Sequence, residues 1–194
     1  MRRRRLLVAP LLAASLLGAC TPPRPLEPAV TTSPRQPFLV RVGAVEVVTT
    51  DGGVRGATFI DKNRAGRLAD AAAAFLRGRL HAAGGTGRLR AVVETAAMEA
   101  LPLPTTVGIP GIFVREPNLL LQGRLKVRLS VLDGGGAELA WAGAEVERAR
   151  RILERTASLA RDDEAERVVD ELLRQLDDAL ERAVPQNLGP YLLL

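Results

Sequence analysis

The sequence predicts an α+β domain in two layers, with two helices on one face of a mainly antiparallel sheet of about four strands. Three observations support this fold class. Two segments have apolar residues at helical spacing, several others alternate as strands do, and together they follow the order β-α-β-β-β-α. With 194 residues, 47% hydrophobic and 25% charged, the chain suits one globular domain with a proper core, which we expect at residues 38–194.

The first two strands are expected at 38–48 and at 88–95. The first is rich in valine, and the glycine-containing segment TTDGGVRG at 49–56 ends it. In the second, Leu89, Ala91 and Val93 lie on one face while charged residues lie largely on the other.

Two segments have the apolar spacing of amphipathic helices. The first, at about 63–82, has Asp61 or Asn63 available as its N-cap and buries one set of residues (Ala65, Leu68, Ala69, Ala72, Phe75, Leu76 and Leu80). The second, at 158–184, is expected to stop at Pro185 and carries a longer stripe (Ala165, Val168, Val169, Leu172, Leu173, Leu176, Ala179, Leu180 and Ala183).

The remaining strands form a predicted hairpin. The segment 121–131 alternates most clearly, because apolar residues at every second position are separated by Gln122, Arg124, Lys126, Arg128 and Ser130. DGGG at 133–136 is expected to be the turn. The next strand runs through Trp141 toward Val146, and the pattern leaves its end open between 147 and 156.

The N-terminus has the three parts of an export signal: the basic block Arg2–Arg5, an apolar stretch at 6–17 and small residues before a processing point. An apolar helix of this length spans about 18 Å, well short of the ~30 Å hydrocarbon core, so we expect cleavage rather than a stable membrane span. Residues 1–19 are therefore predicted to be a signal peptide.

The quartet LGAC at 17–20 resembles the lipobox of bacterial lipoproteins. The resemblance implies cleavage between Ala19 and Cys20, thioether attachment of diacylglycerol to Cys20, and usually acylation of the new amine with a fatty acid such as palmitate. The alternative is a free or disulfide-forming thiol. Because Cys20 is the one cysteine of the chain, it cannot form an internal disulfide.

Residues 20–37 are predicted to be the lipidated cysteine and a proline-rich tether, with prolines at 22, 23, 25, 28, 34 and 37. Such a segment favours extended polyproline conformations and reaches about 50 Å at ~3.1 Å per residue. Thr21 follows the lipidated residue. By the sorting rule of the enterobacterial lipoproteins that the lipobox resembles, the absence of aspartate at this position implies the outer membrane, with the protein on the inner leaflet facing the periplasm.

The charge of the chain does not favour nucleic acid. The formal net charge is +5, but Arg2–Arg5 supply most of the excess, and removing residues 1–19 leaves 27 − 4 = 23 basic against 22 acidic residues. Aromatic residues make up 3% of the chain, which leaves little material for stacking on bases.

Enzymatic classes lack the necessary residues. His81 is the one histidine and Cys20 is expected to carry lipid, so Cys/His nucleophilic sites and histidine-rich metal sites cannot be built. The acidic run at 162–164 is expected to be a solvated helix turn rather than a cation site. A carboxylate-pair hydrolase needs two acids brought together in space, and nothing in the sequence points to one. We expect no catalytic residue, cofactor or metal.

Two segments are candidates for binding a partner. The loop LPLPTTVGIPGIFV at 101–114 offers Ile109, Ile112 and Phe113, although it could instead cover one end of the core. The tail LGPYLLL at 188–194 offers Tyr191 and is either a packed end or a docking peptide.

A third possibility is the basic row Arg124, Lys126 and Arg128, which could bind anionic headgroups unless Glu145 and Glu147 on the next strand balance it. We expect a solvated face.

The lipobox, the proline-rich tether, the opening VRVGAVEV, the Ala/Leu-rich helix, the hairpin and the terminal helix together resemble the auxiliary lipoproteins of ABC-type envelope transporters, over about residues 38–184. The resemblance implies an outer-membrane lipoprotein that accompanies a lipid-handling complex. We therefore expect a non-enzymatic, lipid-anchored periplasmic protein with an envelope protein as partner. The alternative is a lipid or cell-wall binding module, which an apolar cavity between helices and sheet would favour.

Overall fold

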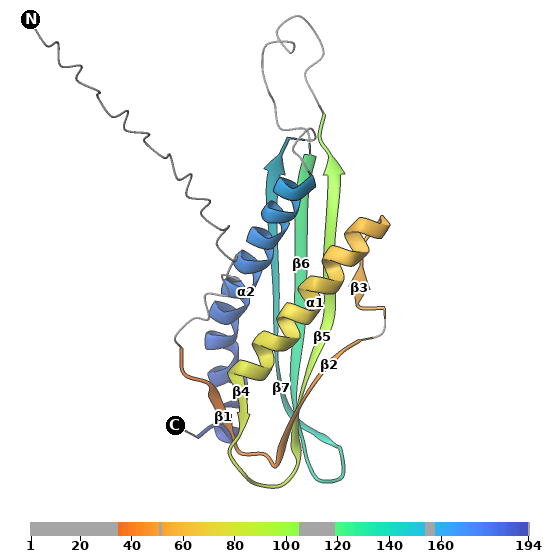
Figure 1. Cartoon of the computed structure of the whole chain (residues 1–194). Helices are drawn as coiled ribbons and strands as arrows, with labels where there is room; N and C mark the ends of the chain where they lie inside the picture. Colours follow the sequence, from red (N-terminus) through yellow and green to blue (C-terminus); the bar gives the residue numbers. More distant parts are fainter. Residues whose placement is uncertain (1–34, 51, 105–118, 154–157, 194) are drawn as a thin grey trace, which may run out of the picture. The chain divides into compact units, whose positions relative to one another are not determined.

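The structure is a computed structural model that describes residues 35–50, 52–104, 119–153 and 158–193. Its main sheet has the strand order β2 (Ala44–Thr49), β5 (Arg88–Pro102), β6 (Leu119–Leu132) and β7 (Glu138–Ile152), and the short β3 (Val54–Arg55) also pairs with β5. β5, β6 and β7 are antiparallel to one another, while β2 and β3 run parallel to β5 (Figure 1). The expected α+β class is confirmed, but the sheet has five strands and is mixed.

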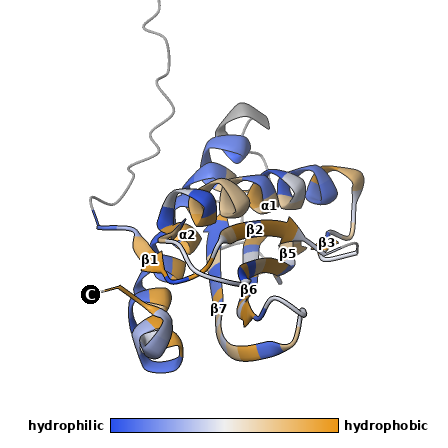
Figure 2. Ribbon diagram, turned by 90° about the horizontal axis from the view of Figure 1, so that it is seen from below, coloured by the Kyte–Doolittle hydropathy of each residue, from blue (hydrophilic) through white to orange (hydrophobic). Residues whose placement is uncertain are grey.

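Two helices, α1 (Phe59–Arg79) and α2 (Ser158–Leu188), lie on the same side of this sheet. α1 packs on β2, β3 and β5, and α2 packs on β6 and β7. Figure 2 shows that both helices carry hydrophilic and hydrophobic residues on different sides, as amphipathic helices over a sheet do. None of the described helices combines the length and the apolar character needed to cross a bilayer.

The predicted first strand at 38–48 is wrong as a single element. β1 (Phe38–Val40) pairs in parallel with β4 (Leu80–Ala82) in a separate two-stranded sheet, and the chain bends before entering β2 in the main sheet. The expected mainly antiparallel order is also wrong at this edge, because α1 is a crossover connection that returns the chain parallel to β2. The alternation of residues along 38–48 cannot by itself reveal that this segment is divided between two sheets.

The boundaries of α1 differ from the expectation at both ends. Its N-cap is Thr58, whose hydroxyl oxygen accepts a hydrogen bond from the Asp61 backbone N–H at 3.1 Å. The Asp61 carboxylate in turn accepts from the Thr58 N–H at 3.3 Å, which completes a capping box. Asp61 therefore lies at the third helical position instead of the cap, and the helix ends at Arg79 because residues 80–82 pair as β4.

The expected stop of α2 at Pro185 is also wrong, because the helix continues to Leu188. A proline cannot donate the backbone hydrogen bond of its position, which usually ends or kinks a helix. Here Leu188 is fully buried in the core, and the side-chain amide of Asn187 donates to the Ala183 carbonyl at 2.8 Å. Burial of the last turn offsets the lost backbone bond.

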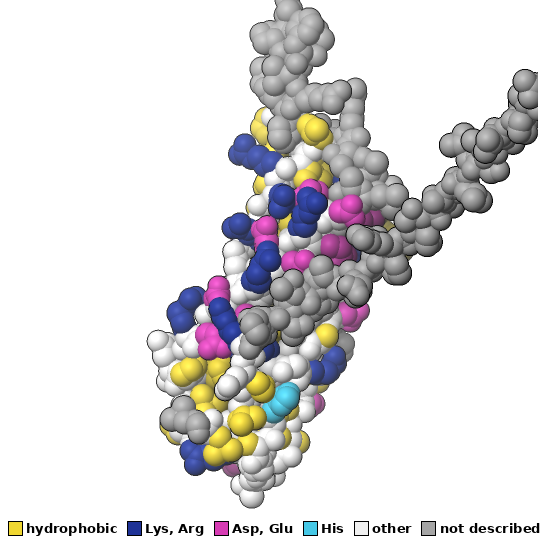
Figure 3. All heavy atoms as spheres, turned by 60° about the vertical axis from the view of Figure 1, so that its left-hand side comes forward, with side chains coloured by type: hydrophobic (Ala, Val, Ile, Leu, Met, Phe, Trp, Pro, Cys, Tyr) yellow, Lys and Arg dark blue, Asp and Glu magenta, His cyan; other side chains and the backbone are white. Residues whose placement is uncertain are grey.

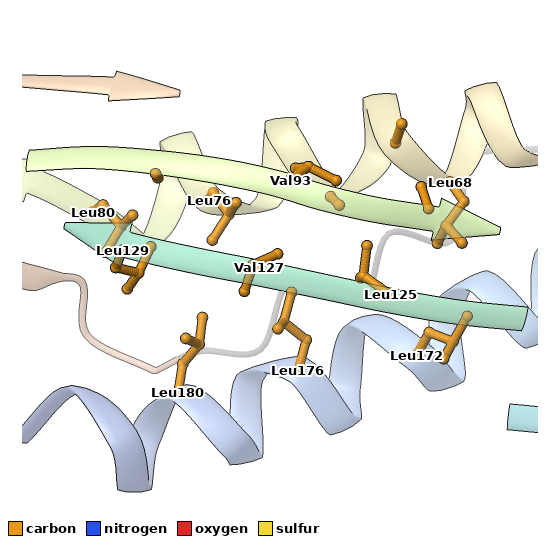
Figure 4. Packing of buried hydrophobic residues seen from close by; sticks show 14 of the residues in the cluster. Leu68, Leu76, Leu80, Val93, Leu125, Val127, Leu129, Leu172, Leu176 and Leu180 are labelled. Atoms are coloured by element: carbon orange, nitrogen blue, oxygen red, sulfur yellow. The ribbon is translucent and has the colours of Figure 1, made fainter. Parts of the chain in front are cut away.

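The core fills the space between the helices and the sheet. Figure 4 shows its side chains pointing toward one another from α1 (Leu68, Leu76), β6 (Leu125, Val127, Leu129) and α2 (Leu172, Leu176, Leu180), and all of them are buried. Each such leucine contributes about 1.5–3 kcal/mol on full burial. The predicted apolar stripes of both helices and the inward face of 121–131 are thereby confirmed.

Candidate functional site

The face of the sheet opposite the helices is exposed and charged. On β6 it carries Gln122, Arg124, Lys126 and Arg128, while the residues between them face the core. Neighbouring strands add residues in register: Glu147 lies opposite Arg124, and Glu145 lies opposite Lys126. This is the basic row that the sequence indicates, on the solvated side that the alternation predicts.

Each cation of this row has a carboxylate partner. Arg124 pairs with Glu147 at 2.9 Å, which the sequence anticipates from the neighbouring strand. Lys126 pairs with Glu94 of β5 at 2.9 Å, and the hydrogen bond raises the pKa of Lys126. The row is therefore neutralised locally and does not present free positive charge to an anionic headgroup.

Arg128 has two partners on β7. Its guanidinium is 2.9 Å from Glu138, whose pKa is lowered by hydrogen bonds from Ser130 and Arg128. Its central carbon also lies 4.2 Å from the centre of the Trp141 ring, which is a cation–π contact. The side of the domain visible in Figure 3 likewise mixes basic and acidic side chains along its length.

A shallow hollow of about 300 Å³ lies beside this tryptophan. Trp141 is 52% exposed, and its six-membered ring approaches Gly143, where a side chain would touch the ring. The walls of the hollow are one aromatic ring and several charged groups, from Glu94, Lys126, Val127, Arg128, Trp141, Gly143, Ala144 and Glu145. Its chemistry suits a polar ligand with an apolar face.

The β5–β6 pair carries the predicted partner-binding loop. The two strands remain in register up to the pair Pro102–Leu119, so Leu101 and Pro102 belong to β5 and not to the loop. Ile109, Ile112 and Phe113 lie outside the described residues. The described strands β5 and β6, which flank them in the sequence, end side by side at Pro102 and Leu119 at one end of the sheet (Figure 1).

The C-terminal segment packs on the domain. After a 3-10 turn at Gly189–Tyr191, the Arg41 N–H donates to the Tyr191 carbonyl at 2.7 Å, and the Leu193 N–H donates to the Leu39 carbonyl at 2.8 Å. Leu192 is buried, and Tyr191 is half-buried against the core. Of the two alternatives for this tail, the described residues favour the packed end.

A buried ion cluster holds the start of the described chain on the domain, and no pattern in the sequence indicates it. Arg79, 5% exposed, donates to Asp177 at 2.8 Å and also bonds Glu181 and the Gln36 carbonyl. Its guanidinium also lies over the Phe38 ring. Arg79 thus joins the end of the tether to both helices.

Arg35 lies on the outer side of the same cluster. It forms ion pairs with Asp177 at 3.3 Å and with Asp178 at 2.7 Å. The hydrogen bond that Arg35 donates to the Asp178 carboxylate raises the pKa of Arg35. An open hollow of about 730 Å³ borders these groups. Residues 35–37, which the sequence assigns to the tether, therefore contact the folded domain, while Ala19 and Cys20 lie outside the described residues.

The remaining residues considered for chemistry have structural partners or surface positions. Asp162 pairs with Arg64 at 3.0 Å, and Glu164 pairs with Arg150 and Arg167. His81 is exposed on β4. Within the described ranges, no group of three His, Cys, Asp or Glu side chains could hold a metal ion.

Neither a protein-family model nor a curated protein matches the sequence. Several solved structures are similar to it, among them the following three. A minor lipoprotein from Acinetobacter baumannii has 13% identity, covers 72% of this chain and 90% of its own, and gives a TM-score of 0.35. Rare lipoprotein B from Shewanella oneidensis has 17% identity, covers 70% of this chain and 88% of its own, and gives a TM-score of 0.34. A lipoprotein from Caulobacter crescentus has 21% identity, covers 70% of this chain and 87% of its own, and gives a TM-score of 0.30. All three are named lipoproteins, but similarity at this level establishes neither a family nor a function for the chain.

Proposed function

We propose that this protein is a non-enzymatic, lipid-anchored periplasmic component that supports an envelope transport machine by binding a protein partner. The anchor is Cys20, and the membrane is the outer membrane, with the domain on its periplasmic side. An ABC-type envelope transporter is the class of machine that the resemblance in layout implies.

The observation that carries this proposal is the filled core. Fully buried leucines from α1, β6 and α2 occupy the space between the layers, and both hollows described above lie on the outer surface. A domain packed in this way binds through its outer surface. The long β5–β6 pair supports the same role, because it carries the apolar loop at one end of a rigid sheet.

The test is crosslinking in intact membranes, followed by identification of the proteins captured. Replacing Ile112 and Phe113 by serine should abolish copurification of the partner and leave the melting temperature nearly unchanged, since apolar anchors often dominate a small interface. The matched control replaces Thr105 and Thr106 by alanine in the same loop and should retain the partner. If the Ile112→Ser/Phe113→Ser variant unfolds or is degraded, the loop is packing material and not a docking site.

The hollow beside Trp141 favours a second candidate function, a cell-wall binding module. An aromatic ring next to carboxylates and a lysine suits the apolar face and the hydroxyl groups of a sugar. Because Trp141 is the one tryptophan of the chain, its emission reports directly on this hollow. Saturable quenching or enhancement by soluble peptidoglycan fragments would support this candidate, and an unchanged emission would remove it.

A further inference from the structure

Phe59 and Ile60 are the most exposed large hydrophobic side chains in the described part of the chain. They are 79% and 58% exposed and occupy the first turn of α1. Removing either side chain from water would lower the free energy, and two such residues side by side form an exposed apolar patch that can mark a binding surface.

The local backbone holds these two side chains outward. The capping box of Thr58 and Asp61 fixes the first turn, and Asp61 is itself buried. The preceding chain packs so closely that a side chain at Gly56 would come within 2.5 Å of the backbone of Asp61 and Lys62. Phe59 and Ile60 are thus presented on a fixed corner, which lowers the entropy lost on binding.

Two basic residues accompany them. Arg55 on β3 and Lys62 on α1 are exposed, and neither forms an ion pair with any described residue. The next arginines along the helix, Arg64 and Arg67, are already paired with α2. The nearest exposed carboxylate of the helix is Asp70, about 15 Å along the axis from Ile60. This corner, defined by Arg55, Phe59, Ile60 and Lys62, therefore combines exposed apolar groups with unpaired positive charge.

We propose that this corner inserts into the interface of an anionic lipid bilayer. Aromatic and aliphatic side chains beside Lys and Arg are the groups that enter the headgroup region of such membranes. The charge complements acidic phospholipids, and it distinguishes this corner from the neutralised sheet face. The corner would orient the domain on the membrane, a role that rests on the proposed lipid anchor.

The length of the tether permits this contact. Arg79 at the C-terminal end of α1 bonds Gln36, and the helix places Phe59 about 30 Å along its axis from Arg79. The segment from Cys20 to Arg35 reaches about 45 Å when extended at ~3.1 Å per residue. The corner can therefore reach the bilayer that holds Cys20.

The experiment replaces the natural anchor, so that it does not depend on lipidation. A histidine tag takes the place of residues 1–19, directly before residue 20 of a Cys20→Ser chain. The tag attaches the protein to vesicles that contain nickel-chelating lipid. With Cys20 replaced, Ile60→Cys provides one thiol for an environment-sensitive fluorophore. Ala74→Cys, exposed on the same helix, is the matched control.

In phosphatidylcholine vesicles that also contain phosphatidylglycerol, the label at 60 should shift to the blue and be protected from an aqueous quencher, whereas the label at 74 should not. Replacing Arg55 and Lys62 by serine should weaken the interaction about 30-fold, since each basic residue near an anionic surface contributes roughly fivefold. Phe59→Ser should lower the affinity of this corner for the anionic vesicles at least about tenfold.

Equal quenching at 60 and 74 would overturn the proposal. Protection at 60 that is the same without phosphatidylglycerol would also overturn it, because the charges would then have no role. Vesicle-independent protection would mean that a protein surface, such as a second copy, covers the corner. Failure of the natural anchor is scored separately, by whether the untagged mature protein floats with membranes.

Discussion

Gly123 is the position where a single added methyl group tests how closely α2 packs on the sheet. It lies in β6 on the core face, beneath the helix. A Cβ there would lie 2.7 Å from Cδ1 of Leu172, 3.0 Å from Cγ1 of Val168 and 3.4 Å from Cε of Met98. Carbon atoms normally approach to about 3.5–4.0 Å, so the helix or these side chains would have to move.

Gly123→Ala changes the free energy of unfolding in two opposite ways. Removing a glycine from a strand interior raises it by about 0.5–1 kcal/mol, whereas overpacking a filled core lowers it by about 1–3 kcal/mol. Because the closest atoms end flexible side chains, we expect a net loss of about 1 kcal/mol for alanine and about 3 kcal/mol for valine. For a domain of this size, the valine variant should melt roughly 6–12 °C lower.

Chemical denaturation and thermal melting measure these losses. Gly134→Ala in the β6–β7 turn is the matched control, because its Cβ would meet nothing within 4 Å, and its stability should change by less than about 0.5 kcal/mol. Leu172→Ala removes the closest atom, so the Gly123→Val/Leu172→Ala double variant should lose about 1–2 kcal/mol less than the two single losses added together. Strict additivity, or a stabilising Gly123→Ala, would refute the close packing of α2 on Gly123.

Three further predictions concern the anchor and the ion pairs. Cys20→Ala should block processing and membrane partition; an unmodified Cys20 in the mature protein, seen by mass spectrometry, would contradict the lipobox assignment. Glu171 has its pKa lowered by the hydrogen bond from Arg148, so its stabilisation is present above the ordinary pKa of 4.5 and lost as the pH falls through the lowered value. Glu171→Gln should therefore destabilise the domain at neutral pH, but no longer well below 4.5 in acid denaturation curves. Arg79→Met should cost about 3 kcal/mol by urea denaturation because it removes the buried partner of Asp177, and Asp177→Leu in the same chain should recover part of that loss.

The sequence could predict features that depend on local periodicity. The alternation at 121–131 identified which side chains of β6 face the core, because successive strand residues point to opposite faces. The spacing at 158–184 identified the buried stripe of α2, because residues three and four apart lie on the same face of a helix. The basic row of the open face follows from this alternation, whereas its balance by Glu147, which the sequence offered as one alternative, depends on the register between β6 and β7.

The tertiary structure decided which segments pair and where elements end. The separation of β1 from β2 depends on a partner strand at 80–82, forty residues away, and on backbone bonds to the C-terminal segment. The partners of Lys126 and Arg128 depend on the register of β5 and β7. Burial of Leu188 carries α2 through Pro185 against local preference. Local sequence determines which face of an element is apolar, whereas distant contacts supply the free energy that selects its neighbours and its ends.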